Sequence, residues 1–502
     1  MSTDELKKYL HNLHCLPHQV AFAEDFLAAK SARKQMLISF PGLGKGFVGS
    51  AIIGYAATHG LADKVLVLAP PGLIAQWSEM IRRKAPDLAT FVVDRPRLRE
   101  LEASQDANST IWPATGVVLM SIDLARQEDV KEKLLRTTWD LLVVEEAQHL
   151  TPGTQRHIAV ARLCDHLPDM RVLLLRVHPL IGSEWDAEKD PLLSDAAITI
   201  WSRETVRDND GNAVLPEVHI KWINHHRSKT EVQLLSQLQD IVRSIAPSEP
   251  QDQLAATIVL QQASSSLFAL EQRLNRMQQQ RNEIVHGGFS ESSHDEGEVQ
   301  TLSDSERPAT THTVFQSELI DQSGGLLSML EDVDSDSKFE SLLALLRDIG
   351  VFTNETCRVC LFTSFVDTAT YLESALSEHP ANVNTITGSM SFAEREQVVA
   401  SFAEKGGILI ATSAMATMIP EVAAVIFYDL PLYSAVLDAR IGQFIRIGRS
   451  DPIRIFAFAD ESKVLTLEEL LRKMVDLKQP IDKGELQQLL FSSDGQNANG
   501  SQ

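Results

Sequence analysis

A glycine-rich turn that ends in a lysine is the part of this sequence with the clearest chemistry. Residues 41–46 read Pro-Gly-Leu-Gly-Lys-Gly, between an apolar run at 36–40 and a segment of helical periodicity at 47–57. A phosphate-binding loop needs this strand–loop–helix context, glycines whose N–H groups surround the anion, a lysine, and a Ser or Thr hydroxyl for magnesium. The predicted nucleotide-binding residues are Gly42, Gly44, Lys45 and Gly46. An ordinary glycine-rich turn is the alternative.

Two consecutive glutamates, Glu145 and Glu146, follow an apolar run about 100 residues after this turn. In nucleotide-hydrolysing sites the first carboxylate after such a strand binds magnesium, and the next orients the attacking water. Glu146 holds the second place. Glu145 holds the first with one methylene more than Asp, which displaces its carboxylate by about 1 Å. Gly46 stands where the magnesium-binding hydroxyl is expected. Two solvated carboxylates at a strand end are the alternative.

Short apolar runs alternate with helical segments in two parts of the chain. Such alternation predicts parallel sheets covered by helices, and therefore an α/β protein of two lobes. The runs lie at 36–40, 65–69, 116–121, 141–144 and 172–175 in the first part, and at 358–363, 383–387, 407–412, 425–428 and 453–458 in the second.

The predicted domain boundaries follow from changes in this pattern. Residues 1–225 form the first lobe and 351–480 the second, with a helical insertion at 226–350 that is Gln- and Leu-rich at helical spacing over 253–284. Residues 286–313 are polar and acidic with few apolar residues, so we expect a disordered stretch there. Residues 481–502 are predicted to be a polar tail.

The composition restricts partners and location. Asp and Glu number 68 against 46 Lys and Arg, a net charge of −22, so DNA binding would need a local basic stripe. The four cysteines are too few for a disulfide framework, and neither a signal peptide nor a membrane-length apolar stretch is evident. We expect a cytoplasmic protein with no membrane partner.

A series of short runs resembles, in order, the helicase motifs of superfamily 2, and most closely the Swi/Snf-type translocases of the RapA (HepA) branch. The resemblance spans most of residues 16–475 and implies two RecA-like lobes with ATP and magnesium in the cleft between them. It adds Gln19 to the nucleotide-binding residues and implies that double-stranded DNA lies across both lobes. The runs that carry it are 16–19, 41–45, 67–71, 76–77, 121–123, 139–150, 263–265, 362–364, 388–391, 429–431 and 440–442.

Several reactive positions depart from the family pattern. Motif II reads Glu-Glu-Ala-Gln at 145–148 instead of Asp-Glu-Ala-His, and motif III reads Arg-Val-His-Pro at 176–179 instead of Thr-Ala-Thr-Pro. In motif V, Thr417, Met418 and Pro420 replace glutamate, glycine and asparagine. In motif VI, Ala439 and Gln443 replace the glutamine and the first arginine finger, so only the second finger, Arg446, keeps its arginine. One finger is worth about 10³ to 10⁵ in rate. Together these changes predict a pseudo-ATPase.

The resemblance also implies contacts to nucleic acid through backbone amides and small polar groups. The matched residues are Pro71, Gly72, Ser121, Ser364 and Thr412. Positive charge nearby comes from residues 82–84 and from arginines at 95, 97 and 99, for which a solvated surface is an equal alternative.

Three hypotheses follow for the function. The leading one is a degenerate, RapA-like helicase-family protein that acts as a DNA-associated or complex-forming subunit with little or no ATP turnover. The second is a slow DNA-stimulated ATPase and double-stranded DNA translocase that uses Glu145, Glu146 and Arg446 as catalytic residues, with magnesium on Glu145. The third is a scaffold that binds only protein partners. By analogy, transcription or phage-defence complexes are plausible settings.

Overall fold

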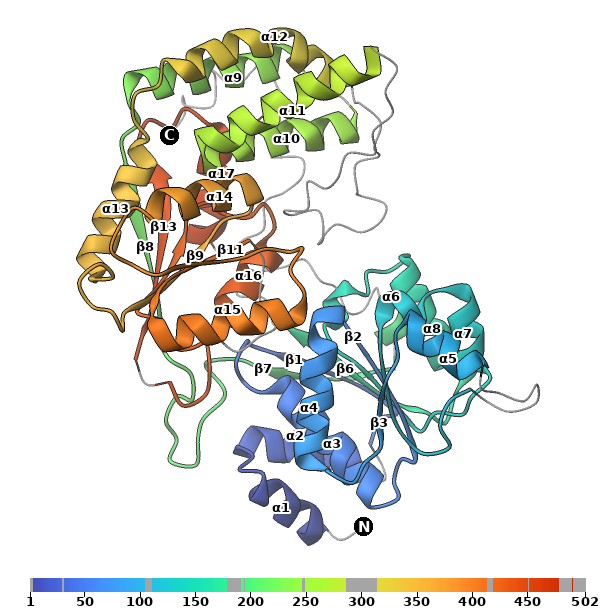
Figure 1. The fold of residues 1–502 in the computed structure, drawn as a ribbon. Coiled ribbons are helices and arrows are strands. Elements are labelled where there is room, and N and C mark those ends of the chain that lie inside the picture. Colours follow the sequence, from blue (N-terminus) through green and yellow to red (C-terminus); the bar gives the residue numbers. More distant parts are fainter. Residues whose placement is uncertain are drawn as a thin grey trace, which may run out of the picture. The chain divides into compact units, whose positions relative to one another are not determined.

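The computed structural model divides the chain into two compact units, each built around one sheet (Figure 1). Contacts group residues up to Pro216, together with Ile445–Asp451, into the first unit, and most of the remaining chain into the second. The structure describes residues 3–28, 31–103, 111–177, 191–193, 195–245, 249–285, 314–412, 419–449, 451–477 and 490. No helix within these ranges is long and apolar enough to cross a membrane.

The first unit contains a seven-stranded sheet in the order β3-β4-β2-β5-β6-β1-β7, in which every pairing is parallel. Its central strands are buried on both faces, so they read as continuous apolar runs in the sequence. The strands are β1 (Lys34–Ser39), β2 (Lys64–Ala69), β3 (Thr90–Val92), β4 (Gly116–Ser121), β5 (Leu141–Val144), β6 (Arg171–Val177) and β7 (Ala197–Trp201).

Helices connect these strands and cover the sheet. The connections bring the carboxyl ends of β1, β5 and β6 to one edge, because these strands are neighbours and parallel. Ligands of open α/β sheets bind at this edge. The helices are α1 (Thr3–Asn12), α2 (Pro17–Leu27), α3 (Lys45–Thr58), α4 (Ile74–Lys84), α5 (Arg95–Ala103), α6 (Ile122–Ala125), α7 (Glu128–Leu135) and α8 (Gln155–His166), with short 3-10 turns η1 (Pro71–Leu73), η2 (Ala147–His149) and η4 (Pro191–Leu193).

The second unit contains a six-stranded parallel sheet in the order β10-β11-β9-β12-β13-β8. Strand β8 pairs with β13 along its whole length, and contacts group it with the second unit, whereas the sequence placed the end of the first lobe after it, at residue 225. The strands are β8 (Val218–His225), β9 (Arg358–Phe362), β10 (Val383–Ile386), β11 (Gly407–Ala411), β12 (Ala424–Phe427) and β13 (Ile453–Asp460).

The helices of the predicted insertion group with the second unit rather than forming a separate body. The stretch predicted as one helical run divides at Ser266, whose backbone is extended (φ −153°, ψ 149°). The predicted disordered stretch and nearly all of the predicted polar tail lie outside the described residues. The helices are α9 (Lys229–Ile245), α10 (Pro250–Ser265), α11 (Leu267–Val285), α12 (Val314–Glu331), α13 (Ser337–Ile349), α14 (Val366–Leu376), α15 (Phe392–Lys405), α16 (Ser434–Gly442) and α17 (Thr466–Leu477).

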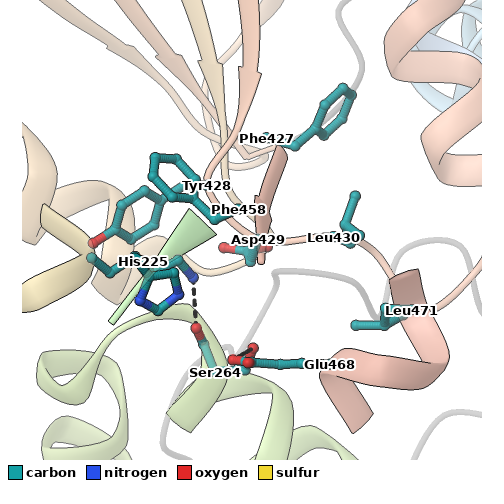
Figure 2. Close-up of a pocket in the computed structure, with 10 residues that line it drawn as sticks. His225, Ser264, Phe427, Tyr428, Asp429, Leu430, Phe458, Glu468 and Leu471 are labelled. Carbon is teal, nitrogen blue, oxygen red and sulfur yellow. Dashed lines mark hydrogen bonds between the residues drawn. The ribbon is translucent and has the colours of Figure 1, made fainter. Parts of the chain in front are cut away.

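A buried lysine joins the insertion to the core of the second unit. Lys338 donates through Nζ to the carbonyl oxygen of Ser264 at 2.6 Å, and Nζ lies 4.5 Å from the ring centroid of Tyr428. These groups line a cavity of about 20 Å³ with His225 and Glu468 (Figure 2). Burial lowers the pKa of Lys338 to about 8. The folded protein therefore carries a lysine that loses its proton around pH 8 rather than near its usual pKa.

This lysine makes a testable contribution to stability. Its pKa in the folded state, about 8, lies below the value of about 10.5 in the unfolded chain, so the unfolded state binds more protons between these pH values. We expect the free energy of unfolding of the wild type to rise from pH 8 to pH 10.5, relative to Lys338→Met, by at most about 3 kcal/mol. Denaturant titrations of both proteins across this range measure the difference, and parallel curves would contradict the expectation.

Candidate nucleotide and nucleic-acid sites

The glycine-rich turn forms a tight loop between β1 and α3. Gly42 and Gly44 have left-handed backbone angles, with φ of 85° and 86°, and Gly44 caps the amino end of α3. A Cβ atom on Gly44 would lie 2.4 Å from Nε2 of Gln19. The left-handed conformation therefore favours glycine at position 44, and a side chain there would also have to displace the amide of Gln19. The loop places the N–H groups at the start of α3 in the arrangement that binds phosphate.

Lys45, at the start of α3, forms ion pairs with both predicted carboxylates. Its Nζ contacts Oε1 of Glu145 and lies 2.7 Å from Oε1 of Glu146. Burial acts to lower the pKa of Lys45, but the two carboxylates outweigh it and raise the pKa well above its usual value. The structure thus brings together the three charged residues that the sequence predicted.

The two glutamates differ in their environments. Burial raises the pKa of Glu145 to about 7, whereas Lys45 outweighs burial at Glu146 and holds its pKa below the usual value. Oε2 of Glu145 is buried without a hydrogen-bond partner among the described residues. An unpaired carboxylate oxygen beside a phosphate-type loop fits a magnesium ligand. Glu145 would hold magnesium, and the ion when bound would neutralise charge on the phosphates.

Gln148 links the second glutamate to the next strand. Its Nε2 donates to Oε2 of Glu146, and its Oε1 accepts a hydrogen bond of 3.3 Å from the backbone N–H of Val177 at the end of β6. Glu146 has a φ of 55°, which is uncommon for a residue with a side chain. Gln148 therefore orients the carboxylate predicted to position water. The histidine and proline of the predicted motif III, at 178–179, lie outside the described residues.

Gln19 packs against the phosphate-type loop, where the resemblance places a nucleotide-binding glutamine. Its Nε2 donates to the carbonyl oxygen of Leu43 at 3.0 Å, and its Oε1 accepts a hydrogen bond of 3.0 Å from the N–H of Leu16. Both ends of the amide are thus used within the protein. Binding of a base by Gln19 would require an exchange of these bonds.

Packing does not force a glycine at position 46. A Cβ atom there would meet Cε of Met80 at 3.5 Å and Cζ2 of Trp77 at 3.9 Å, which are ordinary van der Waals distances. Gly49, one turn further along α3, differs, because its Cβ would lie 3.0 Å from Trp77. A serine would fit at position 46. The missing hydroxyl is therefore a property of the site and not a requirement of the fold.

The predicted nucleic-acid contacts of the first unit lie at one edge of its sheet. Pro71 and Gly72 are exposed in η1 after β2, and Ser121 ends the neighbouring strand β4, in register with Ala69. The Ser121 hydroxyl accepts a hydrogen bond of 3.1 Å from the N–H of Leu124 and caps α6. That these residues bind nucleic acid stays a prediction.

The two predicted contacts of the second unit are buried. The N–H of Ser364 donates to Asp429 at 2.7 Å, and the carbonyl oxygen of Thr412 accepts a hydrogen bond of 2.9 Å from Arg440. Both side chains are almost fully buried. In this conformation the side chains of Ser364 and Thr412 are buried inside the unit and do not reach a ligand at the surface.

The residues matched to the arginine fingers lie just after α16. Arg446 is half-buried in the segment Ile445–Asp451. Gln443, at the place of the first finger, donates through Nε2 to the carbonyl oxygen of Ala439 at 3.1 Å. A glutamine carries no charge to stabilise a phosphoryl group. That this position has lost the function of a finger stays a prediction.

The exposed basic clusters predicted from the sequence are partly neutralised by carboxylates. Arg82 and Arg83 both pair with Glu79. Arg95 pairs with Asp129 at 2.6 Å, and Arg97 pairs with its neighbour on α5, Glu100, also at 2.6 Å. Arg95 and Arg97 are thus each neutralised by one carboxylate, whereas Arg82 and Arg83 share Glu79 and keep one net positive charge.

A different group of arginines went unnoticed in the sequence. Arg126 and Arg156 both contact Asp123, which follows the end of β4. The short-range pair with Arg126 has helical spacing, but no local pattern links Asp123 to Arg156. Only the packing of α6 against α8 brings the two arginines together.

Two parallel sheets with helical connections, a phosphate-type loop and carboxylates at the adjacent strand define a protein with two RecA-like lobes. Residues 18–192 match the model of the SNF2-related domain, and residues 337–448 match that of the helicase conserved C-terminal domain. The chain belongs to the Snf2-like helicases of superfamily 2.

Similar proteins agree with this assignment. The chain is 23% identical over 498 residues to the uncharacterized ATP-dependent helicase YqhH of Bacillus subtilis. The match covers 93% of this chain and 78% of that protein. The Hef helicase domain of Pyrococcus furiosus has a TM-score of 0.54 at 17% identity, covering 91% of this chain and 98% of that one. Dbp5 of S. cerevisiae, solved with RNA and ADP BeF3, has a TM-score of 0.50 at 14% identity, covering 97% and 96%. These structural likenesses support the fold.

Proposed function

We propose that this protein is a degenerate Snf2-like helicase of the RapA-like type that turns ATP over slowly or not at all and acts as a DNA-associated or complex-forming subunit. The observation that carries the proposal is Gly46, which supplies no magnesium-binding hydroxyl although a side chain would fit there. The uncharged Gln443 at the first finger position supports it. ATP is held, if at all, by the loop and Lys45, while the work of the protein lies in DNA and partner binding.

A slow DNA-stimulated ATPase and translocase is the second candidate. It is favoured by the unpaired Oε2 of Glu145 and by the hydrogen bond through which Gln148 orients Glu146. In that reading Lys45 contacts the phosphates, Glu145 holds magnesium, Glu146 positions the water and Arg446 supplies the remaining finger. A scaffold that binds only protein would bind neither nucleotide nor DNA.

Phosphate release by the full chain, with and without saturating double-stranded DNA, separates these candidates. We expect turnover of about 10⁻² s⁻¹ or less, because a typical rate is reduced by at least the value of one arginine finger. Lys45→Ala is the control, since it removes the cation from the loop. DNA-dependent turnover of about 1 s⁻¹ or more that disappears in Lys45→Ala would refute the proposal and establish the ATPase.

A further inference from the structure

Two arginines of the first unit share one carboxylate. Nε and Nη2 of Arg156 lie 2.8 Å and 2.9 Å from the two oxygens of Asp123, and Nε of Arg126 lies 3.1 Å from one of them. All three side chains are about one-third exposed. The group therefore reaches the surface, and in it two guanidiniums share the carboxylate of Asp123.

Arg156 has donors left over from this contact. A guanidinium presents five N–H groups, and Nη1 of Arg156 makes no hydrogen bond among the described residues. The exposed Arg95 differs in two ways. Both of its terminal nitrogens donate to Asp129, and no second arginine in the described part of the chain shares that carboxylate. The Asp123 group is thus better suited than the Arg95–Asp129 pair to hold an added anion.

The backbone around Arg156 also favours an anion. Arg156 is the second residue of α8, and the first turn of this helix contains no acidic residue. The amino end of a helix carries partial positive charge, so a cation there is unfavourable unless an anion is close. Asp123 supplies that anion from the neighbouring helix. A phosphate oxygen would meet the same requirement.

A further arginine and an uncharged histidine lie near the pair. Burial lowers the pKa of His149, and the guanidiniums of Arg156 and Arg176 add to this effect against Glu146 and Asp123. Arg176 is the second-last residue of β6, and His149 lies in η2, which packs against β6. Arg156 and Arg176 thus add positive charge near the carboxyl edge of the first sheet, whereas His149, with its lowered pKa, is uncharged at neutral pH.

The group lies next to a predicted nucleic-acid contact. Asp123 belongs to α6, the helix that Ser121 caps, and β4 is in register with the strand that leads to Pro71 and Gly72. In Figure 1, α6 and α8 lie side by side in the first unit. A DNA strand that met the exposed Pro71 and Gly72 would have its phosphates within the same edge of the unit.

We propose that Arg126 and Arg156 form a binding site for a backbone phosphate of double-stranded DNA, and that Asp123 holds both guanidiniums in place until the phosphate displaces it. Arginine suits this role because its planar fork binds a phosphate through two hydrogen bonds. The inference rests on the DNA-associated part of the proposed function and assigns that binding to particular residues. Asp123 opposes the phosphate by charge and competes with it for the same donors.

The opposite roles of the two kinds of residue provide the test. We expect Arg156→Gln to weaken binding of a labelled DNA duplex about tenfold at moderate salt and to reduce the slope of log affinity against log salt by about 1. We expect Asp123→Asn to strengthen binding severalfold, because it frees the guanidiniums and removes a repelling charge. Arg95→Gln is the matched control and should change affinity less than about twofold.

A purely structural role of the cluster predicts a different result. Loss of a structural contact would weaken DNA binding in both Arg156→Gln and Asp123→Asn, in step with their thermal stability. Unchanged affinity in Arg156→Gln, or equal losses in Arg156→Gln and Arg95→Gln, would overturn the site. If Asp123→Asn does not fold, Arg156→Lys provides the test. Lysine keeps the positive charge but lacks the planar fork, so we expect a DNA affinity between those of the wild type and Arg156→Gln.

Failure of this site and failure of the proposed function remain separable. Rapid ATP turnover with weaker DNA binding by Arg156→Gln would refute the pseudo-ATPase and retain the site. Slow turnover with unchanged DNA binding by Arg156→Gln would retain the pseudo-ATPase and refute the site. A wild type that binds no duplex even at low salt would overturn the site and leave a protein-only scaffold.

Discussion

Combining Gly46→Ser with Gln443→Arg is expected to raise DNA-dependent ATP turnover by about 10² to 10³-fold over the wild type. The serine supplies the missing magnesium hydroxyl at a position where its Cβ meets neighbours only at 3.5 Å or more. The arginine restores charge at the place matched to the first finger. The expected gain is at the low end of the value of a finger because the changes in motifs III and V remain. Steady-state phosphate release with saturating duplex DNA measures it.

The single variants make this result interpretable. Gly46→Ser alone should strengthen magnesium-dependent ATP binding with little change in turnover, and Gln443→Arg alone should leave the magnesium site incomplete. Addition of Lys45→Ala to the double variant should abolish the gained activity. If the double variant folds, binds ATP and still shows wild-type turnover, the degeneration lies elsewhere, and our account of Gly46 and Gln443 is wrong.

Replacement of Arg227 is expected to have the largest effect on stability. This arginine is buried and donates at 2.7 Å both to Asp460, the last residue of β13, and to Glu468 of α17. Removal of one partner from a buried ion pair leaves uncompensated charge, so Arg227→Met should lower the free energy of unfolding of the second unit by about 3–5 kcal/mol. Chemical denaturation of the full chain measures the loss.

An exposed pair in the same unit provides the control for this prediction. Arg281 pairs with Asp321 between α11 and α12, where both side chains are at least half exposed. We expect Arg281→Met to cost less than about 1 kcal/mol. Similar losses in the two variants would mean that burial does not set the strength of the Arg227 contacts.

The sequence predicted the two sheets because their central strands are buried on both faces. Strands β4 and β5 lie where the apolar runs were, and both are fully apolar or small in sequence. Strands β7 and β8 were missed because they are sheet edges that expose many side chains and show no continuous apolar run. The break at Ser266 was also missed, since helical periodicity continues on both sides of it.

The chemistry of the phosphate-type loop was readable from the sequence because it depends on local order: the conformation of Gly44, the position of Lys45 after it, and carboxylates at the end of an apolar strand. The RapA-like branch and the loss of ATP turnover stay predictions. Ser364 and Gly72 were both predicted from short motifs to contact nucleic acid. Only the structure shows that Ser364 is buried and that Gly72 is exposed.

By itself the sequence determined that this protein has two α/β lobes and a phosphate-type loop without its magnesium hydroxyl, since these features follow from residue types at short spacing. Only the tertiary structure decided which charges remain available. It pairs Arg95 with Asp129, and it brings Arg156 to Asp123 across 33 residues of chain, beside Arg126. Electrostatic fields depend on distances in space, and those distances are set by how the helices pack on the sheet.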